Sequence, residues 1–174
     1  VLEYVEGGDL RDHLKKLNNS PGFDAELCNI AVGVAKALSH LHHGLGGNSC
    51  LIHRDVKPEN VLLTKDKVAK LADLGEARFY NKLDSQKDTT AMTLVGTPYY
   101  LAPEIILGNK YNEKVDVYSF GIMLNEMDAK CIPYRSLKTG FRQALVARSR
   151  NPLRPRTRWA TADDIDKHFI QLAT

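Results

Sequence analysis

The chain combines apolar stripes at helical spacing with short runs at strand spacing. One stripe begins after Asp9, a residue suited to an N-cap, and predicts a short helix; it consists of Leu10, Leu14 and Leu17. A second stripe within residues 24–43 predicts a long helix that packs on a core; it consists of Leu27, Ile30, Ala31, Val34, Leu38 and Leu41. The glycine-rich stretch 44–47 predicts the end of this helix.

Strand-like runs follow the long helix. They lie at 50–52, 61–63 and 68–72, and a polar turn between the last two predicts a hairpin. Residues 74–100 contain few apolar residues and many Thr, Ser, Lys and Asp, so we predict a long loop there. Residues 112–127 become apolar on almost every side, which predicts a buried central helix.

A last helix is predicted at 161–173, where Thr161 and Asp164 form a pattern like a capping box. The chain contains no internal repeat and no low-complexity tract. These patterns predict one mainly α domain over residues 1–174, with a small β hairpin and short strands.

Composition excludes several classes of protein. The 174 residues are 43% hydrophobic and 26% charged, which is enough to bury a core and unlike a disordered tail or a membrane protein. No apolar run approaches the roughly 20 residues of a membrane span, and no signal peptide pattern is present. We therefore expect an intracellular, cytoplasmic protein, with no membrane segment in this chain.

Three smaller features of the sequence each have a simple structural explanation. The arginine-rich region 141–158 is interpreted as a solvated basic face, with nucleic-acid binding as the alternative that is not expected. Three cysteines lie too far apart for a C-x-x-C site and predict buried, reduced thiols; they are Cys28, Cys50 and Cys131. A histidine cluster predicts either a helix end, which is favoured, or a metal site; it consists of His40, His42 and His43.

The stretch 51–63, LIHRDVKPENVLL, places chemically active side chains between two apolar runs. In extended backbone, residues two apart point the same way, so Asp55 and Lys57 can face one substrate. Asn60 lies where the chain re-enters a strand, and Asp73 follows the next hairpin. The carboxylate can accept a hydroxyl proton, the ammonium can meet phosphate charge, and the remaining oxygens suit Mg²⁺. The set predicts phosphoryl transfer in preference to a decorated surface turn.

With these residues in place, the sequence resembles the eukaryotic protein kinase family. HRDVKPEN (53–60) is similar to the catalytic loop, DLG (73–75) to the metal-binding triplet, and APE (102–104) to the end of the activation segment. DVYSFG (116–121) resembles the buried central helix of that family. Leu74 replaces the phenylalanine that is usual in the triplet but keeps its apolar character.

The resemblance implies a protein-kinase-like C-terminal lobe. Residues 1–8 would form the interlobe linker, 9–174 a truncated lobe, and 73–104 the activation segment. No glycine-rich loop and no V-A-I-K lysine occur in the chain, so the N-terminal lobe is expected to be absent. The resemblance implies an active serine/threonine kinase as the parent protein, with features of the tyrosine-kinase-like group, and an inactive isolated fragment. The parent would be either a soluble enzyme or a receptor with a cytoplasmic kinase domain. The alternative is a pseudokinase or a non-catalytic scaffold.

The resemblance also implies roles for individual residues. Asp55 would be the catalytic base, Lys57 would neutralise the γ-phosphate of ATP, and Asn60 and Asp73 would hold Mg²⁺. Lys57 is typical of kinases whose substrate is a protein Ser or Thr hydroxyl, and Thr97 points the same way. Three further residues would be structural: His53 in the loop, Asp116 as an acceptor for loop N–H groups or a helix first-turn acid, and Glu104 as the partner of an arginine that the chain lacks.

Nucleotide and regulatory contacts follow from the same resemblance. Glu3 and Val5 would present backbone groups to adenine, Leu62 would pack under the ring, and Asp9 would meet the ribose or a basic substrate residue. Arg54 would grip a phosphate on the activation segment, with Arg78 as a second ligand. An activating kinase is expected at Thr93; alternatives are an unmodified loop or phosphorylation of Ser85, Thr89 or Thr90.

Overall fold

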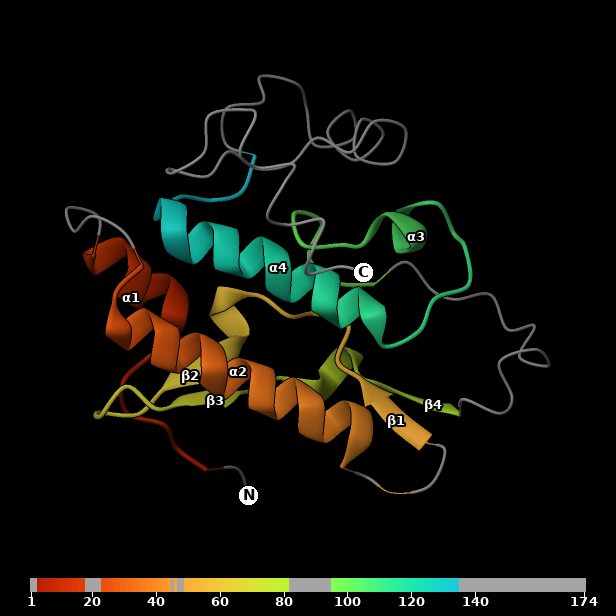
Figure 1. Ribbon diagram of the computed structural model, residues 1–174, viewed down its shortest axis with the longest axis horizontal. Helices are drawn as coiled ribbons and strands as arrows, with labels where there is room; N and C mark the ends of the chain where they lie inside the picture. Colours follow the sequence, from red (N-terminus) through yellow and green to blue (C-terminus); the bar gives the residue numbers. More distant parts are fainter. Residues whose placement is uncertain (1–2, 18–22, 45, 47–48, 82–94, 135–174) are drawn as a thin grey trace.

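The computed structural model describes residues 3–17, 23–44, 46, 49–81 and 95–134. Their elements, in chain order, are α1 (Leu10–Lys16), α2 (Ala25–His43), β1 (Ser49–Ile52), the 3-10 turn η1 (Pro58–Asn60), β2 (Val61–Leu63), β3 (Ala69–Leu71), the 3-10 turn η2 (Leu74–Glu76), β4 (Arg78–Asn81), α3 (Pro103–Ile106) and α4 (Lys114–Ala129). The helices α2 and α4 lie side by side, and α2 also contacts β1 and β3 (Figure 1). Helices with a few short antiparallel strands agree with the mainly α prediction.

Both predicted N-terminal helices are confirmed, together with the cap of the first. The Asp9 carboxylate accepts a hydrogen bond from the backbone N–H of Asp12 at 2.8 Å, and Asp24 caps α2 in the same way through Leu27. Each cap satisfies a donor that the first turn of a helix leaves free. The predicted stripe of α2 is buried except at Leu41, which is half-buried, and the helix ends at His43 as expected.

Two small antiparallel sheets form. The predicted hairpin is confirmed: β2 pairs with β3 in the register Val61↔Leu71. The prediction of one uninterrupted loop over 74–100 is wrong, because β4 lies within it and pairs with β1 in the register Ser49↔Asn81. The partner of β4 lies well upstream in the sequence, and Phe79 at the centre of β4 is 70% exposed, so no run of buried apolar residues marks the strand.

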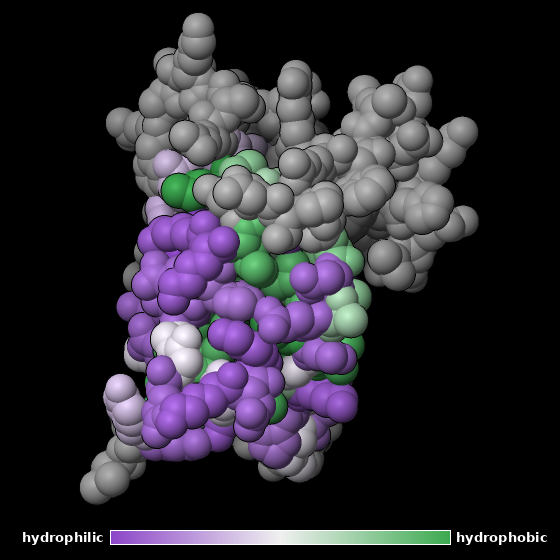
Figure 2. Space-filling model, turned by 90° about the vertical axis from the view of Figure 1, so that its left-hand side faces the viewer, coloured by the Kyte–Doolittle hydropathy of each residue, from purple (hydrophilic) through white to green (hydrophobic). Residues whose placement is uncertain are grey.

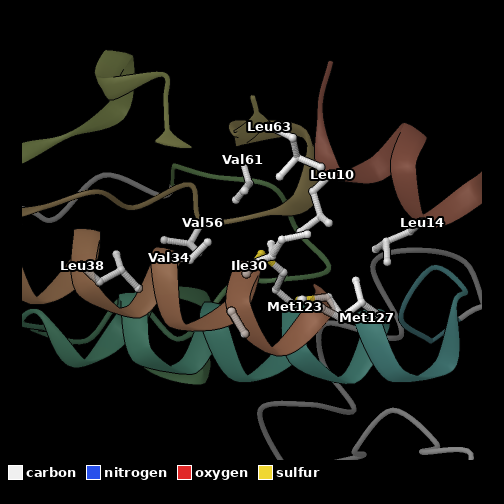
Figure 3. Packing of buried hydrophobic residues seen from close by; sticks show 12 residues of the cluster. Leu10, Leu14, Ile30, Val34, Leu38, Val56, Val61, Leu63, Met123 and Met127 are labelled. Carbon is white, nitrogen blue, oxygen red and sulfur yellow. The ribbon is translucent and has the colours of Figure 1, made fainter. Parts of the chain in front are cut away.

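One core joins the helices to the segment that carries the candidate chemistry. Twelve buried residues from α1, α2, α4, β2 and the loop before η1 pack together (Figure 3). Val56 belongs to this core and is fully buried between Asp55 and Lys57. Burial of one such side chain contributes about 1.5–3 kcal/mol. Because Val56 is held inside, its two polar neighbours are directed to the other side of an extended segment.

The central helix α4 is buried as predicted, but its buried face is partly polar. Asp116, Ser119, Asn125 and Glu126 are all buried, whereas Val117 is 57% exposed. The spacing of apolar residues alone does not predict which residues of α4 are buried, because a polar residue can be buried where a partner from another segment forms a hydrogen bond with it.

The prediction of three buried thiols is wrong for two of them. Cys50 is buried in β1, but Cys28 and Cys131 are exposed.

The basic region 141–158 and the predicted helix 161–173 lie outside the described residues. No helix in the described part of the chain is long and apolar enough to cross a membrane. The end of the molecule that carries α1 has a mostly hydrophilic surface with an apolar patch in its middle (Figure 2).

Candidate active site

Asp55 is the centre of the candidate site. Its Oδ2 accepts hydrogen bonds from Lys57 Nζ at 2.6 Å and from Asn60 Nδ2 at 2.9 Å. Its Oδ1 accepts from the backbone N–H and the hydroxyl of Thr97, at 2.8 and 2.7 Å. Lys57 Nζ also donates to Thr97 Oγ1 at 2.7 Å, so the carboxylate, the ammonium and the hydroxyl form one closed set. The structure brings together three residues that the sequence predicts for one site, and adds Thr97.

The surroundings of Asp55 favour its charged form. Burial would raise the pKa of this carboxyl group, but the hydrogen bonds from Lys57 and Thr97 outweigh burial, and the net effect lowers the pKa below its ordinary value. Asp55 is therefore a carboxylate at neutral pH. A carboxylate that keeps its negative charge near a substrate hydroxyl can orient that hydroxyl and accept its proton.

The loop that carries Asp55 is fastened to α4 by a buried carboxylate. Asp116 accepts the backbone N–H groups of His53 and Arg54, each at 2.8 Å. His53 is fully buried; its Nε2 lies 3.0 Å from the Ala72 carbonyl oxygen, and the Asp55 N–H donates to its Nδ1 at 3.3 Å. A single neutral tautomer, with the proton on Nε2, satisfies both contacts.

His42 completes this anchor, and sequence reasoning missed its role. The histidine is buried, and its Nε2 lies 2.8 Å from Asp116 Oδ2. The sequence shows no carboxylate near the histidine cluster because Asp116 lies 74 positions away. The helical spacing does indicate that His42 is buried, because His42 follows the stripe position Leu38 by four residues and so lies on the same face of α2.

Asn60 and Asp73 offer the oxygen atoms that a hard cation needs. Asn60 uses its amide nitrogen for two bonds to Asp55, so within the described part of the chain its amide oxygen has no hydrogen-bond partner. Asp73 is exposed, and one of its carboxylate oxygens accepts the Gly75 N–H at 3.2 Å. The two residues come close through the backbone, since the Ala72 N–H donates to the Asn60 carbonyl oxygen at 2.8 Å. A carboxylate and an amide oxygen are both ligands that suit Mg²⁺.

Residues 7–9 run along β2, the strand that follows the candidate catalytic segment. The Gly7 N–H donates to the Leu63 carbonyl oxygen, and the Leu63 N–H to the Gly8 carbonyl oxygen, both at 2.8 Å. Asp9 forms a β-bridge with Leu62, which places these two predicted nucleotide-binding residues side by side. The side chain of Asp9 is used as the cap of α1.

Two further predicted nucleotide-binding residues lie just before this pairing. Glu3 is exposed and pairs with Lys70 of β3, whereas Val5 is half-buried. The predicted roles of their backbone groups toward adenine stay predictions.

The predicted regulatory residues Arg54 and Arg78 and the predicted structural residue Glu104 lie in three different segments. Arg54 donates from Nε to the Glu76 carbonyl oxygen at 2.5 Å and from Nη1 to the Tyr111 hydroxyl at 3.2 Å. Arg78 lies in β4, opposite Ile52. Glu104 lies in the first turn of α3 and is half-buried. Thr93 lies outside the described residues, as do Ser85, Thr89 and Thr90, so a phosphate contact with Arg54 stays a prediction.

Comparison with known proteins identifies the family. Residues 1–174 match the family described as protein kinase domain. The chain belongs to this family. It is 34% identical over 98% of its length to the serine/threonine-protein kinase pakB and 34% identical over 92% to pakC, both of Dictyostelium discoideum. It is also 38% identical over 77% of its length to the serine/threonine-protein kinase shk2 of Schizosaccharomyces pombe. The chain spans 19%, 32% and 21% of these three relatives, respectively.

Family membership confirms the resemblance that the motifs indicated. In this kinase domain, Leu74 takes the place of the usual phenylalanine, lies in η2 and is 51% exposed. Asp73 before it adopts a left-handed backbone conformation with φ of 60°, which is uncommon for a residue other than glycine. Such strained residues cluster at functional sites, and this one precedes a turn at the candidate cation site.

Proposed function

We propose that this chain is the C-terminal lobe of a serine/threonine protein kinase, which transfers the γ-phosphate of ATP to Ser or Thr hydroxyls of proteins. One observation carries the proposal: Lys57, Asn60 and Thr97 all donate to the carboxylate of Asp55. This arrangement gives a buried base, a cation for phosphate charge and an amide oxygen on one wall, which is the set of groups that phosphoryl transfer requires.

Asp55 acts on the substrate hydroxyl. Because its pKa is lowered, the carboxylate is charged at neutral pH and can accept a hydrogen bond from the hydroxyl, orient it and take its proton as the bond to phosphorus forms. Lys57 lies 2.6 Å from Asp55 Oδ2 and is the cation nearest to the reacting atoms among the described residues of this loop. Its ammonium group would offset charge on the transferred phosphoryl group.

Asn60 and Asp73 would hold Mg²⁺ through their side-chain oxygens. Bound Mg²⁺ supplies charge neutralisation at the phosphate oxygens. Glu3, Val5, Asp9 and Leu62 would contact the adenosine part of ATP, in keeping with the pairing of residues 7–9 along β2.

Regulation by phosphorylation is part of the same proposal. Arg54 would grip a phosphate on the activation segment 73–104, with Arg78 as its second ligand and Thr93 as the site that an activating kinase modifies. Phosphorylation adds a double negative charge that pairs well with guanidinium groups, and this pairing orders the segment.

A test of phosphate transfer separates an active kinase from a pseudokinase. The complete natural protein that contains this sequence is incubated with radiolabelled ATP, Mg²⁺ and a library of Ser- and Thr-containing peptides. We expect label on Ser or Thr, and a loss of about 10²–10⁴-fold in Asp55→Asn, because that change removes the base. Asp66→Asn, an exposed carboxylate in the turn between β2 and β3, is the matched control. Equal labelling by the parent protein and Asp55→Asn would contradict the proposal.

A further inference from the structure

Arg11 is the residue at which four segments of the described chain meet. Its Nε donates to Glu59 Oε1 at 3.0 Å, and its Nη2 donates to the Tyr100 hydroxyl at 2.5 Å. Its Nη1 pairs with one carboxylate oxygen of Glu126, and the Tyr100 hydroxyl donates to the other. Arg11 belongs to α1, Glu59 to η1, Tyr100 to the segment before α3, and Glu126 to α4. Each of the three nitrogens of this guanidinium group therefore donates a hydrogen bond to a different segment.

This cluster is largely excluded from water. Glu126 and Tyr100 are 1% and 2% exposed, and the Arg11 side chain is 12% exposed. Burial and the adjacent Glu126 raise the pKa of Tyr100, so its hydroxyl keeps the proton that it donates. In such surroundings a charge-assisted hydrogen bond is strong and the geometry of each donor matters. Arg11 is thus a well-fixed connector, unlike the long exposed cations elsewhere on α1.

Two of the connected segments carry the residues that hydrogen-bond to the candidate catalytic carboxylate of Asp55. Glu59 lies in η1 between Lys57 and Asn60, and the Asn60 N–H donates to the Lys57 carbonyl oxygen at 3.0 Å. The Tyr100 N–H donates to the Thr97 carbonyl oxygen at 2.9 Å. The side chains of Lys57, Asn60 and Thr97 all donate to the carboxylate of Asp55.

We propose that Arg11 is a positioning residue for phosphoryl transfer, holding η1 and the segment 97–100 against α4 in the arrangement that keeps Lys57 and Thr97 on Asp55. Arg11 touches none of the reacting groups and acts only through Glu59 and Tyr100. The proposal rests on the proposed function for its effect on rate. Small displacements of catalytic groups cost large factors in rate, which gives this remote connector an influence on kcat.

Substitution of Arg11 tests this role in the complete natural protein. Arg11→Met keeps an unbranched side chain, which is shorter than that of arginine, and removes all three hydrogen bonds. We expect kcat to fall about tenfold or more with KM for ATP changed by less than about threefold, because the site is misaligned while the nucleotide contacts are retained. Lys15→Met is the matched control: it removes one cation one turn later on α1, and Lys15 is exposed and bonded to Asp12. The control is expected to keep the parent kcat.

Arg11→Lys separates positioning from charge and remains informative if Arg11→Met does not fold. Lysine keeps the cation beside Glu126 but lacks the planar guanidinium that reaches three partners. If Arg11 positions the two segments, Arg11→Lys melts near the parent temperature and still shows a kcat lowered about fivefold or more. A kcat within about twofold of the parent in Arg11→Lys would overturn the proposal.

Hydrogen–deuterium exchange provides a readout that does not depend on activity. Peptides covering 55–63 and 97–101 are compared between the parent protein and Arg11→Lys. Faster exchange in both peptides, with unchanged exchange in Lys15→Met, supports the proposal, and unchanged exchange in either peptide of Arg11→Lys contradicts it. If the parent protein and Asp55→Asn transfer phosphate equally, the proposed function fails, and the exchange result alone then decides whether Arg11 holds both segments.

Discussion

The carbonyl oxygen of Arg54 lies directly against Gly96, so that a β-carbon on Gly96 would come within 2.5 Å of it. Gly96 also has φ of 103°, a conformation that other residues rarely adopt. The next residue is Thr97, whose N–H and hydroxyl both donate to Asp55. The close approach of two backbones at Gly96 therefore sets how near Thr97 comes to the loop that carries Asp55.

Gly96→Ala is expected to push Thr97 away from Asp55. Its β-carbon must displace the Arg54 backbone, and the left-handed conformation adds strain of about 1–3 kcal/mol. We expect a lower melting temperature together with a fall in kcat of about tenfold or more. Gly108→Ala is the control, because Gly108 also has positive φ but nothing lies within 4 Å of its added β-carbon. An equal effect of the two substitutions on kcat would contradict this explanation.

Thr97→Val tests how the pKa of Asp55 is held down. The hydrogen bonds of Lys57 and Thr97 lower this pKa against the effect of burial. Loss of the Thr97 hydroxyl removes one of these bonds, so the pKa of Asp55 rises. We expect the acidic limb of the pH profile of kcat/KM to shift to higher pH. Thr97→Ser keeps the hydroxyl and should leave the limb in place; a shift of the same size in Thr97→Ser would exclude the hydroxyl as the cause.

Asp116→Asn is expected to loosen the loop that carries Asp55. Asp116 accepts from His53 and Arg54 N–H groups on its two different oxygens, with His42 on one of them. An asparagine turns one of these acceptors into a donor, which then faces another donor. We expect a loss of about 2–3 kcal/mol in the free energy of unfolding, measured by urea denaturation.

The same substitution should increase hydrogen–deuterium exchange at residues 53–55. Asp66→Asn, in the exposed turn, serves as the control for loss of a negative charge. Stability of Asp116→Asn equal to that of the control would show that Asp116 does not anchor the loop.

The sequence predicts the wall of the site that is local in the chain and misses the parts that depend on distant partners. Asp55, Lys57 and Asn60 lie within six positions, so their spacing alone predicts that they share one site. Val56 is fully buried between Asp55 and Lys57, which agrees with the alternation expected in an extended segment. Arg11 and Glu126 are separated by 115 positions, and the sequence around either residue does not predict their contact.

Residues that are polar yet buried account for most of what could not be predicted. His42, Glu126 and Tyr100 are buried because partners from other segments satisfy them, which only the assembled fold shows. Strand β4 was missed for a related reason: its pairing partner β1 lies upstream of the hairpin, and half of its residues face solvent. The intrinsic preferences of residues along the chain predict neither the partners of the buried polar residues nor the pairing of β4 with β1.

Glu126 makes folding depend on pH in a direction opposite to that of an ordinary surface carboxylate. Burial raises the pKa of Glu126 from 4.5 to about 7, and the contacts from Tyr100 and Arg11 offset only part of this rise. A carboxyl group with a higher pKa in the folded state binds more protons when folded than when unfolded. Its contribution to the free energy of unfolding is therefore complete below pH 4.5 and is lost as the pH rises to about 7.

Glu126→Gln removes this titration while keeping the size and hydrogen-bonding capacity of the side chain. We expect the free energy of unfolding of the parent protein to fall, relative to that of Glu126→Gln, as the pH rises from 4.5 to 7 in urea denaturation. Arg11, Glu59 and Tyr100 face this carboxyl group and are present in both proteins, so their contributions are largely matched. Glu6→Gln, at an exposed carboxylate, should keep the parent pH dependence. If the parent protein and Glu126→Gln have parallel curves over this range, Glu126 is ionised throughout, and its pairing with Arg11 outweighs burial.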